Sequence, residues 1–275
     1  MVKNESEQDL VDHLDGKKFS DLALVLKPFV TMLNGDIEPD AGCIIYAERP
    51  KKQPASSEQL RKDFPKSKTW KPKRDIIVTI NGAPKKVSCK SGDSNSIHQE
   101  KWKYFRKLLS RLGASPEEIK AFDDFVHSKD KQYFKEKKKP DKKCLDKGYA
   151  QKFAPDAHAK EKKLMQDFLK RKKKKLLTHF VKTGHCSKEG HAEYVYHCAP
   201  EGWIKFGDVL KEPKFERVDL FIKKMMKAKD DGTDKATTLP LGGMSFQRWN
   251  TCPKSKYKLD TIQWGKGLEP RKHLR

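Results

Sequence analysis

The chain has 275 residues, with 61 Lys or Arg against 38 Asp or Glu and a formal net charge of +23 at pH 7. Repulsion of that size opposes a compact fold, and a polyanionic partner whose counterions are released on binding compensates for it, so nucleic acid is the first expected partner. No stretch approaches the roughly 18 consecutive apolar residues that a membrane-spanning helix needs. The N-terminus lacks the pattern of a secretory signal, and we therefore expect a cytoplasmic protein with no membrane partner.

The first part of the chain carries a helical pattern and then a strand. Over residues 5–33, leucine and phenylalanine recur at mostly helical spacing, with a break expected near Gly16. Residues 43–47 form a short apolar run typical of a strand. Residues 49–73 are rich in Lys, Pro and Ser and indicate an exposed connection.

Residues 75–90 carry the clearest local signal, a β-hairpin. Residues 75–80 are rich in β-branched side chains, Asn81-Gly82 is the strongest two-residue hairpin turn, and residues 86–90 can return as the partner strand. In a hairpin closed at this turn, the numbers of facing residues sum to about 163, which places Asp75 opposite Ser88. Lys90, two residues further along, then points to the same face. Pro84 also allows a register shifted by two, which would set Asp75 directly opposite Lys90 and keep the same face.

A capping box follows the hairpin. Ser96 with Gln99 three positions later is the usual start signal of a helix, so a helix is expected to begin near Ile97. The first turn of such a helix would point Glu100 back at the strand end of the hairpin. Two acids and one lysine are therefore expected to converge at a sheet rim.

Further elements are expected along the rest of the chain. Ser115 to Glu118 repeats the helix start signal, residues 128–163 are dominated by Lys and Asp and indicate a solvated loop, and a helix over 160–182 ends at Gly184. Strands are expected at 192–197, 203–210 and 217–222. The order of elements favours an α/β or α+β fold with a central mixed β-sheet flanked by helices.

Six cysteines stand apart along the chain, with no CxxC pair. In a cytoplasmic chain they are more often buried apolar side chains than a disulfide framework. Metal-ligand types do gather at His185, Cys186, His191, His197 and Cys198, but their spacing does not follow the paired arrangement of a structural zinc site. A strand over 192–197 is an ordinary explanation for several of them, so zinc is not favoured.

The expected cluster suits phosphodiester hydrolysis. Carboxylates such as Asp75 and Glu100 are ligands for Mg²⁺, a hard cation that keeps waters and phosphate oxygens as its other ligands. A metal held in this way polarises the phosphoryl group and activates a water molecule. The ammonium group of Lys90 can stabilise the negative charge that develops on the phosphate.

At these residues the chain resembles type II restriction endonucleases of the PD-(D/E)xK nuclease superfamily. The usual pattern has an Asp on the first strand and an acid, any residue and Lys on the second, whereas the second element here reads Ser88-Cys89-Lys90. A variant within that superfamily supplies the missing carboxylate from the following helix, and Glu100 stands where this replacement is expected. Asp40 or Glu48 could assist the site, and His98 is a further auxiliary candidate.

The resemblance implies a catalytic set of Asp75, Lys90, Glu100 and Ser88, with Asp75 and Glu100 as ligands of Mg²⁺, for which Mn²⁺ can substitute. It also implies cleavage of double-stranded DNA at a short specific sequence, in the cytoplasm of a prokaryotic cell, by a homodimer whose genetic partner is a cognate DNA methyltransferase. One endonuclease domain, 1–275, is expected, with a catalytic half, 1–130, built on the core hairpin 75–90. A DNA-recognition or dimerisation half is expected over 160–275.

Polar side chains suited to reading DNA bases occur near the C-terminus. Gln247, Arg248 and Asn250 can form bidentate hydrogen bonds with adenine or guanine edges in the major groove. Asn95 and Gln99 are expected to contact DNA near the active site.

Two other functions fit the same sequence. In a non-catalytic basic protein that binds DNA or RNA, the hairpin and its neighbours would be scaffold, because acids at strand starts and helix N-termini are common for structural reasons. A nuclease of the same fold that acts in repair or on branched DNA is the other alternative.

Overall fold

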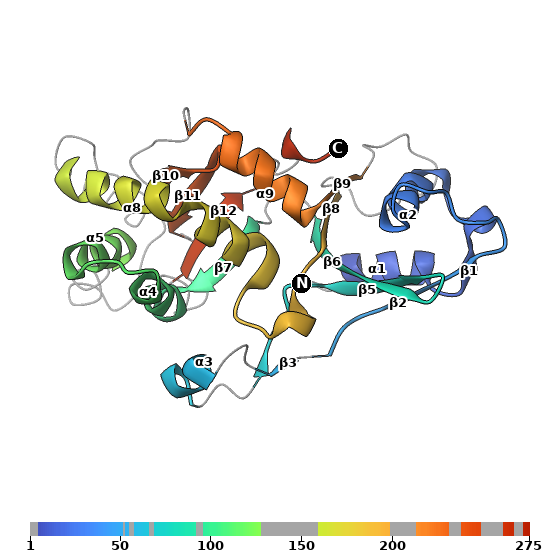
Figure 1. Cartoon of the computed structure of the whole chain (residues 1–275), viewed down its shortest axis with the longest axis horizontal. Helices are drawn as coiled ribbons and strands as arrows, with labels where there is room; N and C mark the ends of the chain where they lie inside the picture. The colour runs from blue at the N-terminus through green and yellow to red at the C-terminus, as the bar shows by residue number, and fades with distance from the viewer. Residues whose placement is uncertain are drawn as a thin grey trace, which may run out of the picture. The chain divides into compact units, whose positions relative to one another are not determined.

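The computed structural model describes residues 5–51, 53–54, 58–65, 69–91, 96–127, 159–198, 213–230, 238–248, 261–266 and 272–275. These residues form an α/β structure with a mixed six-stranded sheet, a four-stranded antiparallel sheet and one two-stranded ribbon (Figure 1). This architecture confirms the predicted mixed sheet with helices. Among the described helices, none is long and apolar enough to cross a membrane.

The chain divides into two compact units. The first takes residues 1–95, 177–224 and 267–275, and the second takes residues 96–176 and 225–266. The units are therefore interleaved along the sequence and do not coincide with the expected halves 1–130 and 160–275. The functional roles expected for those halves stay predictions.

The sheet of the first unit mixes antiparallel and parallel pairing. In sheet order its strands are β1 (Lys17–Lys18), β2 (Ile44–Glu48), β5 (Ile76–Ile80), β6 (Ala83–Ser91), β8 (Tyr194–Cys198) and β9 (Lys214–Arg217). Only β6 and β8 run parallel, and all other neighbours are antiparallel. The predicted strands at 43–47 and 192–197 thus correspond to β2 and β8.

The central hairpin, β5 and β6, has the predicted register. Ile80 faces Ala83 and Ile76 faces Val87, so the numbers of facing residues sum to 163. The turn residues Asn81 and Gly82 have φ values of 51° and 75°. A two-residue turn with both φ values positive matches the right-handed twist of the strands it joins, which fixes this register.

Helices α1 (Glu5–Leu14) and α2 (Lys27–Leu33) belong to the first unit. The predicted break near Gly16 is confirmed, since the chain passes through Gly16 at φ 70° and then makes two short 3-10 turns before α2. Helix α1 packs against β2 and β5 (Figure 1). The ring of Phe29 in α2 lies 4.6 Å from that of Tyr196 in β8, so helix and sheet share one core.

Short elements interrupt the connection predicted over 49–73. Strands β3 (Gln53–Pro54) and β4 (Thr69–Trp70) pair as a small ribbon, and α3 (Glu58–Asp63) lies between them in sequence. This segment leads directly into β5 and therefore positions the residues that precede the hairpin.

The second unit has an antiparallel sheet of its own. In sheet order its strands are β10 (Thr238–Leu241), β11 (Met244–Arg248), β12 (Thr261–Lys266) and β7 (Ser96–Lys101). Its helices include α4 (Trp102–Arg111), α5 (Pro116–His127) and most of α8 (Ala159–Thr178) (Figure 1). Aromatic rings join helices to sheet, because Phe246 of β11 lies 5.4 Å from Phe105 and 6.1 Å from Phe122.

The predicted helix start near Ile97 is wrong, because residues 96–101 form strand β7. Ser96 pairs with Lys266 and Gln99 with Gln263, so neither caps a helix. Burial alternates from His98 to Lys101, as a strand requires. Pairing with β12, which lies far away in sequence, overrides the local start signal, and α4 begins only at Trp102.

The remaining predictions have mixed outcomes. Helix α8 and its π-helical last turn, His179–Thr183, end at Gly184 as predicted. The strand predicted at 217–222 is wrong, because β9 ends at Arg217 and helix α9 (Val218–Lys227) follows. The strand predicted at 203–210 lies outside the described residues, as does most of the loop predicted at 128–163.

Candidate active site

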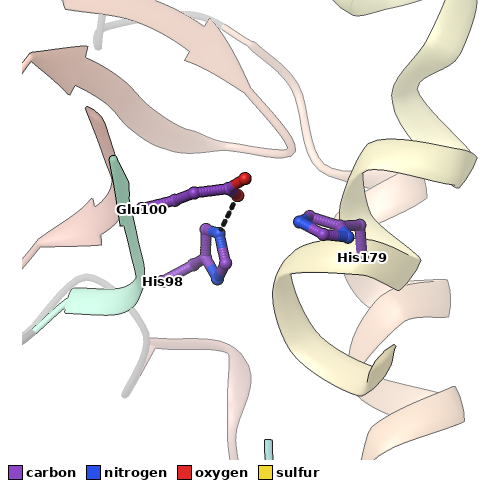
Figure 2. Close-up of side chains that lie close together, drawn as sticks. All are labelled: His98, Glu100 and His179. Carbon is purple, nitrogen blue, oxygen red and sulfur yellow. Dashed lines mark hydrogen bonds and ion pairs between the residues drawn. The ribbon is translucent and has the colours of Figure 1, made fainter. Parts of the chain in front are cut away.

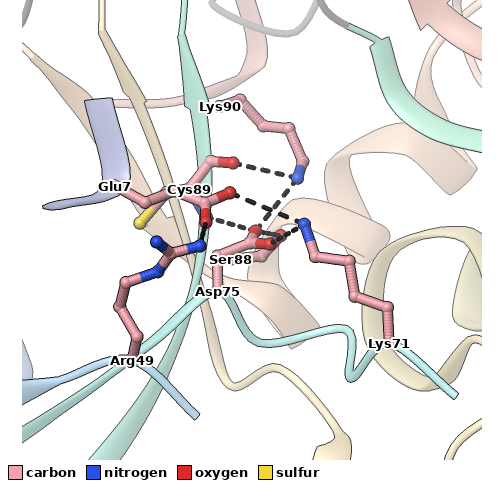
Figure 3. Close-up of polar contacts among 7 residues, drawn as sticks. All are labelled: Glu7, Arg49, Lys71, Asp75, Ser88, Cys89 and Lys90. Carbon is pink, nitrogen blue, oxygen red and sulfur yellow. Dashed lines mark hydrogen bonds and ion pairs between the residues drawn. The ribbon is translucent and has the colours of Figure 1, made fainter. Parts of the chain in front are cut away.

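Asp75 lies immediately before β5 in the first unit, and only 5% of its surface is exposed. Its Oδ2 atom accepts three hydrogen bonds (Figure 3): from the hydroxyl of Ser88 at 3.1 Å, from the backbone N–H of Cys89 at 2.8 Å and from Nζ of Lys90 at 3.2 Å. The structure therefore brings Asp75, Ser88 and Lys90 together on one face of the hairpin, as its register implies.

The backbone of the hairpin sets this geometry. The N–H of Asp75 donates to the carbonyl of Val87 at 2.7 Å, which extends the ladder by one residue beyond β5. Lys90 is held at two points, because its Nζ also donates to the carbonyl of Cys89 at 2.9 Å. Its side chain is 16% exposed, so this ammonium is fixed and largely shielded from water.

A second set of charges surrounds the other oxygen of Asp75. Nζ of Lys71 lies 3.2 Å from Oδ1 of Asp75 and 3.6 Å from Oε1 of Glu7 in α1. Nη2 of Arg49 lies 3.1 Å from Oε2 of Glu7 (Figure 3). Sequence analysis missed Glu7, Lys71 and Arg49. Lys71 has one local signal, its place in the basic stretch just before Asp75. Glu7 and Arg49 have none, because the approach of α1 with Glu7 depends on tertiary packing.

The charges of this cluster favour an ionised Asp75. Burial alone would raise the pKa of Asp75, but the ammonium groups of Lys90 and Lys71 outweigh burial and bring that pKa below its ordinary value. Burial also lowers the pKa of Lys73 to about 7, and repulsion from Lys90 adds to this shift. A buried, ionised carboxylate at a sheet rim is a donor group suited to a hard divalent cation.

Glu100 and His98 belong to the second unit, where both lie buried on β7. Nε2 of His98 lies 2.7 Å from Oε2 of Glu100 (Figure 2). Glu100 is on a strand and not in the first turn of a helix, which corrects the route by which the sequence was expected to place it. Because Asp75 belongs to the first unit, the metal centre expected to join these two acids stays a prediction.

The residues expected to read DNA are described only in part. Gln99 is exposed on β7 and donates to Oε1 of Gln263 at 3.4 Å, and Gln247 is half-buried on β11. Arg248 ends β11, while Asn95 and Asn250 lie outside the described residues. The auxiliary candidate Glu48 is exposed at the end of β2, facing Ile77 of β5.

The metal-ligand types near residue 190 have ordinary structural surroundings. The thiol of Cys186 donates to the carbonyl of Thr183 at 3.1 Å, and burial raises the pKa of this thiol, which disfavours the thiolate that a metal would bind. His197 is fully buried on β8, and His191 is partly buried. Cys198 ends β8.

The mixed sheet with its helices is a restriction-endonuclease-like α/β fold. No family model matches the sequence, and no curated protein does. A solved structure of restriction endonuclease MspI in complex with its cognate DNA is similar, with a TM-score of 0.53 over 94% of this chain and 86% of that chain. The identity is 9%, so this likeness shows the fold alone.

Proposed function

We propose that the chain is a sequence-specific double-stranded DNA endonuclease of the type II restriction kind, which hydrolyses phosphodiester bonds with Mg²⁺. The observation that carries the proposal is the contact of buried Asp75 with Ser88 and Lys90 on the central hairpin. A fold similar to that of MspI and a net charge of +23 both support it.

Each residue of the cluster has a role in this proposal. Asp75 binds the divalent ion, and Glu100 is the second acid that the sequence predicts as its ligand. Mn²⁺ can take the place of Mg²⁺. When bound, the ion supplies Lewis-acid polarisation of the phosphate and an activated water. Lys90 stabilises negative charge on the phosphate, and Ser88 holds Asp75 in position without adding a second negative charge. Glu48 and His98 are auxiliary candidates.

A row of glutamines supports DNA reading by the second unit. Gln247 of β11 faces Gln263 of β12, which in turn faces Gln99 of β7. Side chains opposite one another on neighbouring strands share a face of the sheet, so the three amides line up across three strands. Gln side chains pair with adenine through two hydrogen bonds. Gln263 is only 2% exposed and accepts from Gln99 within the sheet, so we propose Gln247 and Gln99 of this row, with Arg248, Asn250 and Asn95, as DNA-contacting residues.

The proposal extends to the assembly and its genetic setting. Two-fold symmetry of a homodimer would match a palindromic site and bring one active site to each strand. A cognate DNA methyltransferase would be the genetic partner, in the cytoplasm of a prokaryotic cell.

Incubation with plasmid DNA tests the proposal. With Mg²⁺, the wild-type protein should give discrete fragments that disappear in EDTA. Lys90→Ala should reduce the rate about 10²-fold or more, as expected when a group that stabilises transition-state charge is removed. Lys85→Ala, which removes a lysine nearer the turn of the same hairpin, is the matched control and should cut like the wild type.

The outcome also separates the alternatives. Intact plasmid that is bound by the protein would favour a non-catalytic DNA- or RNA-binding function. Fragments whose ends share no common sequence, or selective cutting of branched DNA, would favour a repair nuclease. Sequencing the fragment ends therefore tests catalysis and specificity together.

A further inference from the structure

Lys71 bridges two carboxylates that come from distant parts of the chain. Its Nζ lies 3.2 Å from Oδ1 of Asp75 and 3.6 Å from Oε1 of Glu7 (Figure 3). The contact of Lys71 is with Oδ1 of Asp75. The hydrogen bonds from Ser88, Cys89 and Lys90 go to the other oxygen, Oδ2. The ammonium group of Lys71 thus lies between two carboxylate oxygens, where their negative charges favour a cation.

The two lysines that contact Asp75 differ in their exposure to water. The side chain of Lys71 is 71% exposed, whereas that of Lys90 is 16% exposed. Lys90 also has the carbonyl of Cys89 as a second acceptor inside the fold. The ammonium of Lys71 is open to water, whereas the two carboxylates that it contacts are mostly buried, at 4% exposed for Asp75 and 15% for Glu7. Lys71 can therefore turn into solvent once another cation takes over its contact with Asp75, while Lys90 is held in place.

Glu7 is held independently of Lys71. It lies in α1, which packs against β2 and β5, and its Oε2 atom is 3.1 Å from Nη2 of Arg49. The side chain of Glu7 is 15% exposed. Its Oε1 atom consequently stays directed at the same cation position when Lys71 moves away.

We propose that Asp75 and Glu7 form a divalent-cation site and that Lys71 competes with the cation for these two carboxylates. The inference rests on the proposed function, to which it adds a carboxylate ligand and a built-in competitor. A hard divalent ion prefers carboxylate oxygens to other protein ligands. Because the ion and the ammonium repel each other and need the same oxygens, Lys71 must turn into solvent before the ion binds.

Titration with Mn²⁺, followed by the electron paramagnetic resonance of the free ion, tests this competition on the full chain after metal removal. Lys71→Met should bind Mn²⁺ roughly fivefold more tightly than the wild type, since the ion no longer has to displace an ammonium from the two carboxylates. Glu7→Gln should weaken binding and Asp75→Asn should abolish it. Lys85→Met removes the same charge from the hairpin that follows and should leave Mn²⁺ affinity unchanged.

A double variant separates competition from a general effect of charge. In the Glu7→Gln background, Lys71→Met should gain less affinity, because Lys71 has already lost one of its two partners. The inference is overturned if Lys71→Met binds Mn²⁺ no more tightly than Lys85→Met. It is also overturned if Glu7→Gln binds Mn²⁺ as tightly as the wild type. Asp75→Asn that binds Mn²⁺ as tightly as the wild type would instead overturn the proposed metal site itself. Thermal unfolding of each variant shows that it is folded.

Discussion

The hydroxyl of Ser88 donates a 3.1 Å hydrogen bond to Oδ2 of Asp75, and both residues are buried. In the nuclease pattern that the hairpin sequence resembles, an acid stands at the position of Ser88. Here the pair is a donor and an acceptor, which stabilises the ionised carboxylate and avoids the repulsion of two adjacent anions. The local chemistry of the hairpin therefore favours one charged acid, with any further carboxylate supplied by another element.

Removal of this donor should destabilise the protein. Ser88→Ala is expected to lower the free energy of unfolding by about 1–2 kcal/mol, because a buried charged acceptor loses one of its partners. Denaturation in urea measures the change. Ser20→Ala, which removes an exposed hydroxyl that contacts Asp21, should change stability by only a few tenths of that amount. Equal effects of the two substitutions would contradict a special role for Ser88.

Stability should fall in acid through Glu216 of β9. Burial would raise the pKa of Glu216, but contacts with Lys224 at 2.8 Å and Arg275 at 3.2 Å lower it below the ordinary value. A lowered carboxyl pKa contributes stability that is present above the unfolded value of about 4.3 and is lost as pH falls through the folded value. Below pH of about 4.3, Glu216→Gln should therefore lose stability less steeply than the wild type. Identical slopes in urea denaturation would exclude this contribution.

The hairpin turn should depend on glycine at position 82. Gly82 has a φ of 75°, and a side chain added there would meet no other atom within 4 Å. Gly82→Ala should therefore cost about 1–2 kcal/mol through backbone strain alone. Gly42→Ala is the matched control, since Gly42 also lies in open space but is not in the left-handed region. It should be neutral or slightly stabilising.

Base recognition by the glutamine row can be tested on Gln247 of β11. If Gln247 pairs with an adenine, Gln247→Ala should relax the preference at one base pair by about 1–3 kcal/mol, or roughly 5- to 150-fold. Cleavage of plasmids that differ by one base pair in the determined site measures this preference. A uniform loss of rate across all sites would assign Gln247 to phosphate contact or to folding.

The register of the central hairpin follows from its own residues. Asn81 and Gly82 accept the positive φ angles of a tight turn, and alternation of side chains then fixes which residues face each other. The amino-acid sequence alone therefore suffices to group Asp75, Ser88 and Lys90. This grouping needs no contact from outside the segment.

Two similar start signals show where local reasoning fails. The hydroxyl of Ser115 accepts a hydrogen bond from the N–H of Glu118 in α5. The carboxylate of Glu118 accepts one from the N–H of Ser115, which completes a capping box. Ser96 and Gln99 have the same spacing but lie in strand β7, paired with β12. The difference comes from a partner strand distant in sequence, whose hydrogen bonds and buried surface exceed the modest energy of a cap.

By itself, the sequence determined the class of fold, the polyanionic partner expected from the charge and the hairpin that gathers Asp75 and Lys90. These features follow from composition and from interactions within a few residues. Only the tertiary structure decided that Glu100 lies on a strand beside His98 and that Glu7 and Lys71 reach Asp75. Such contacts depend on the packing of whole elements, which no local periodicity encodes.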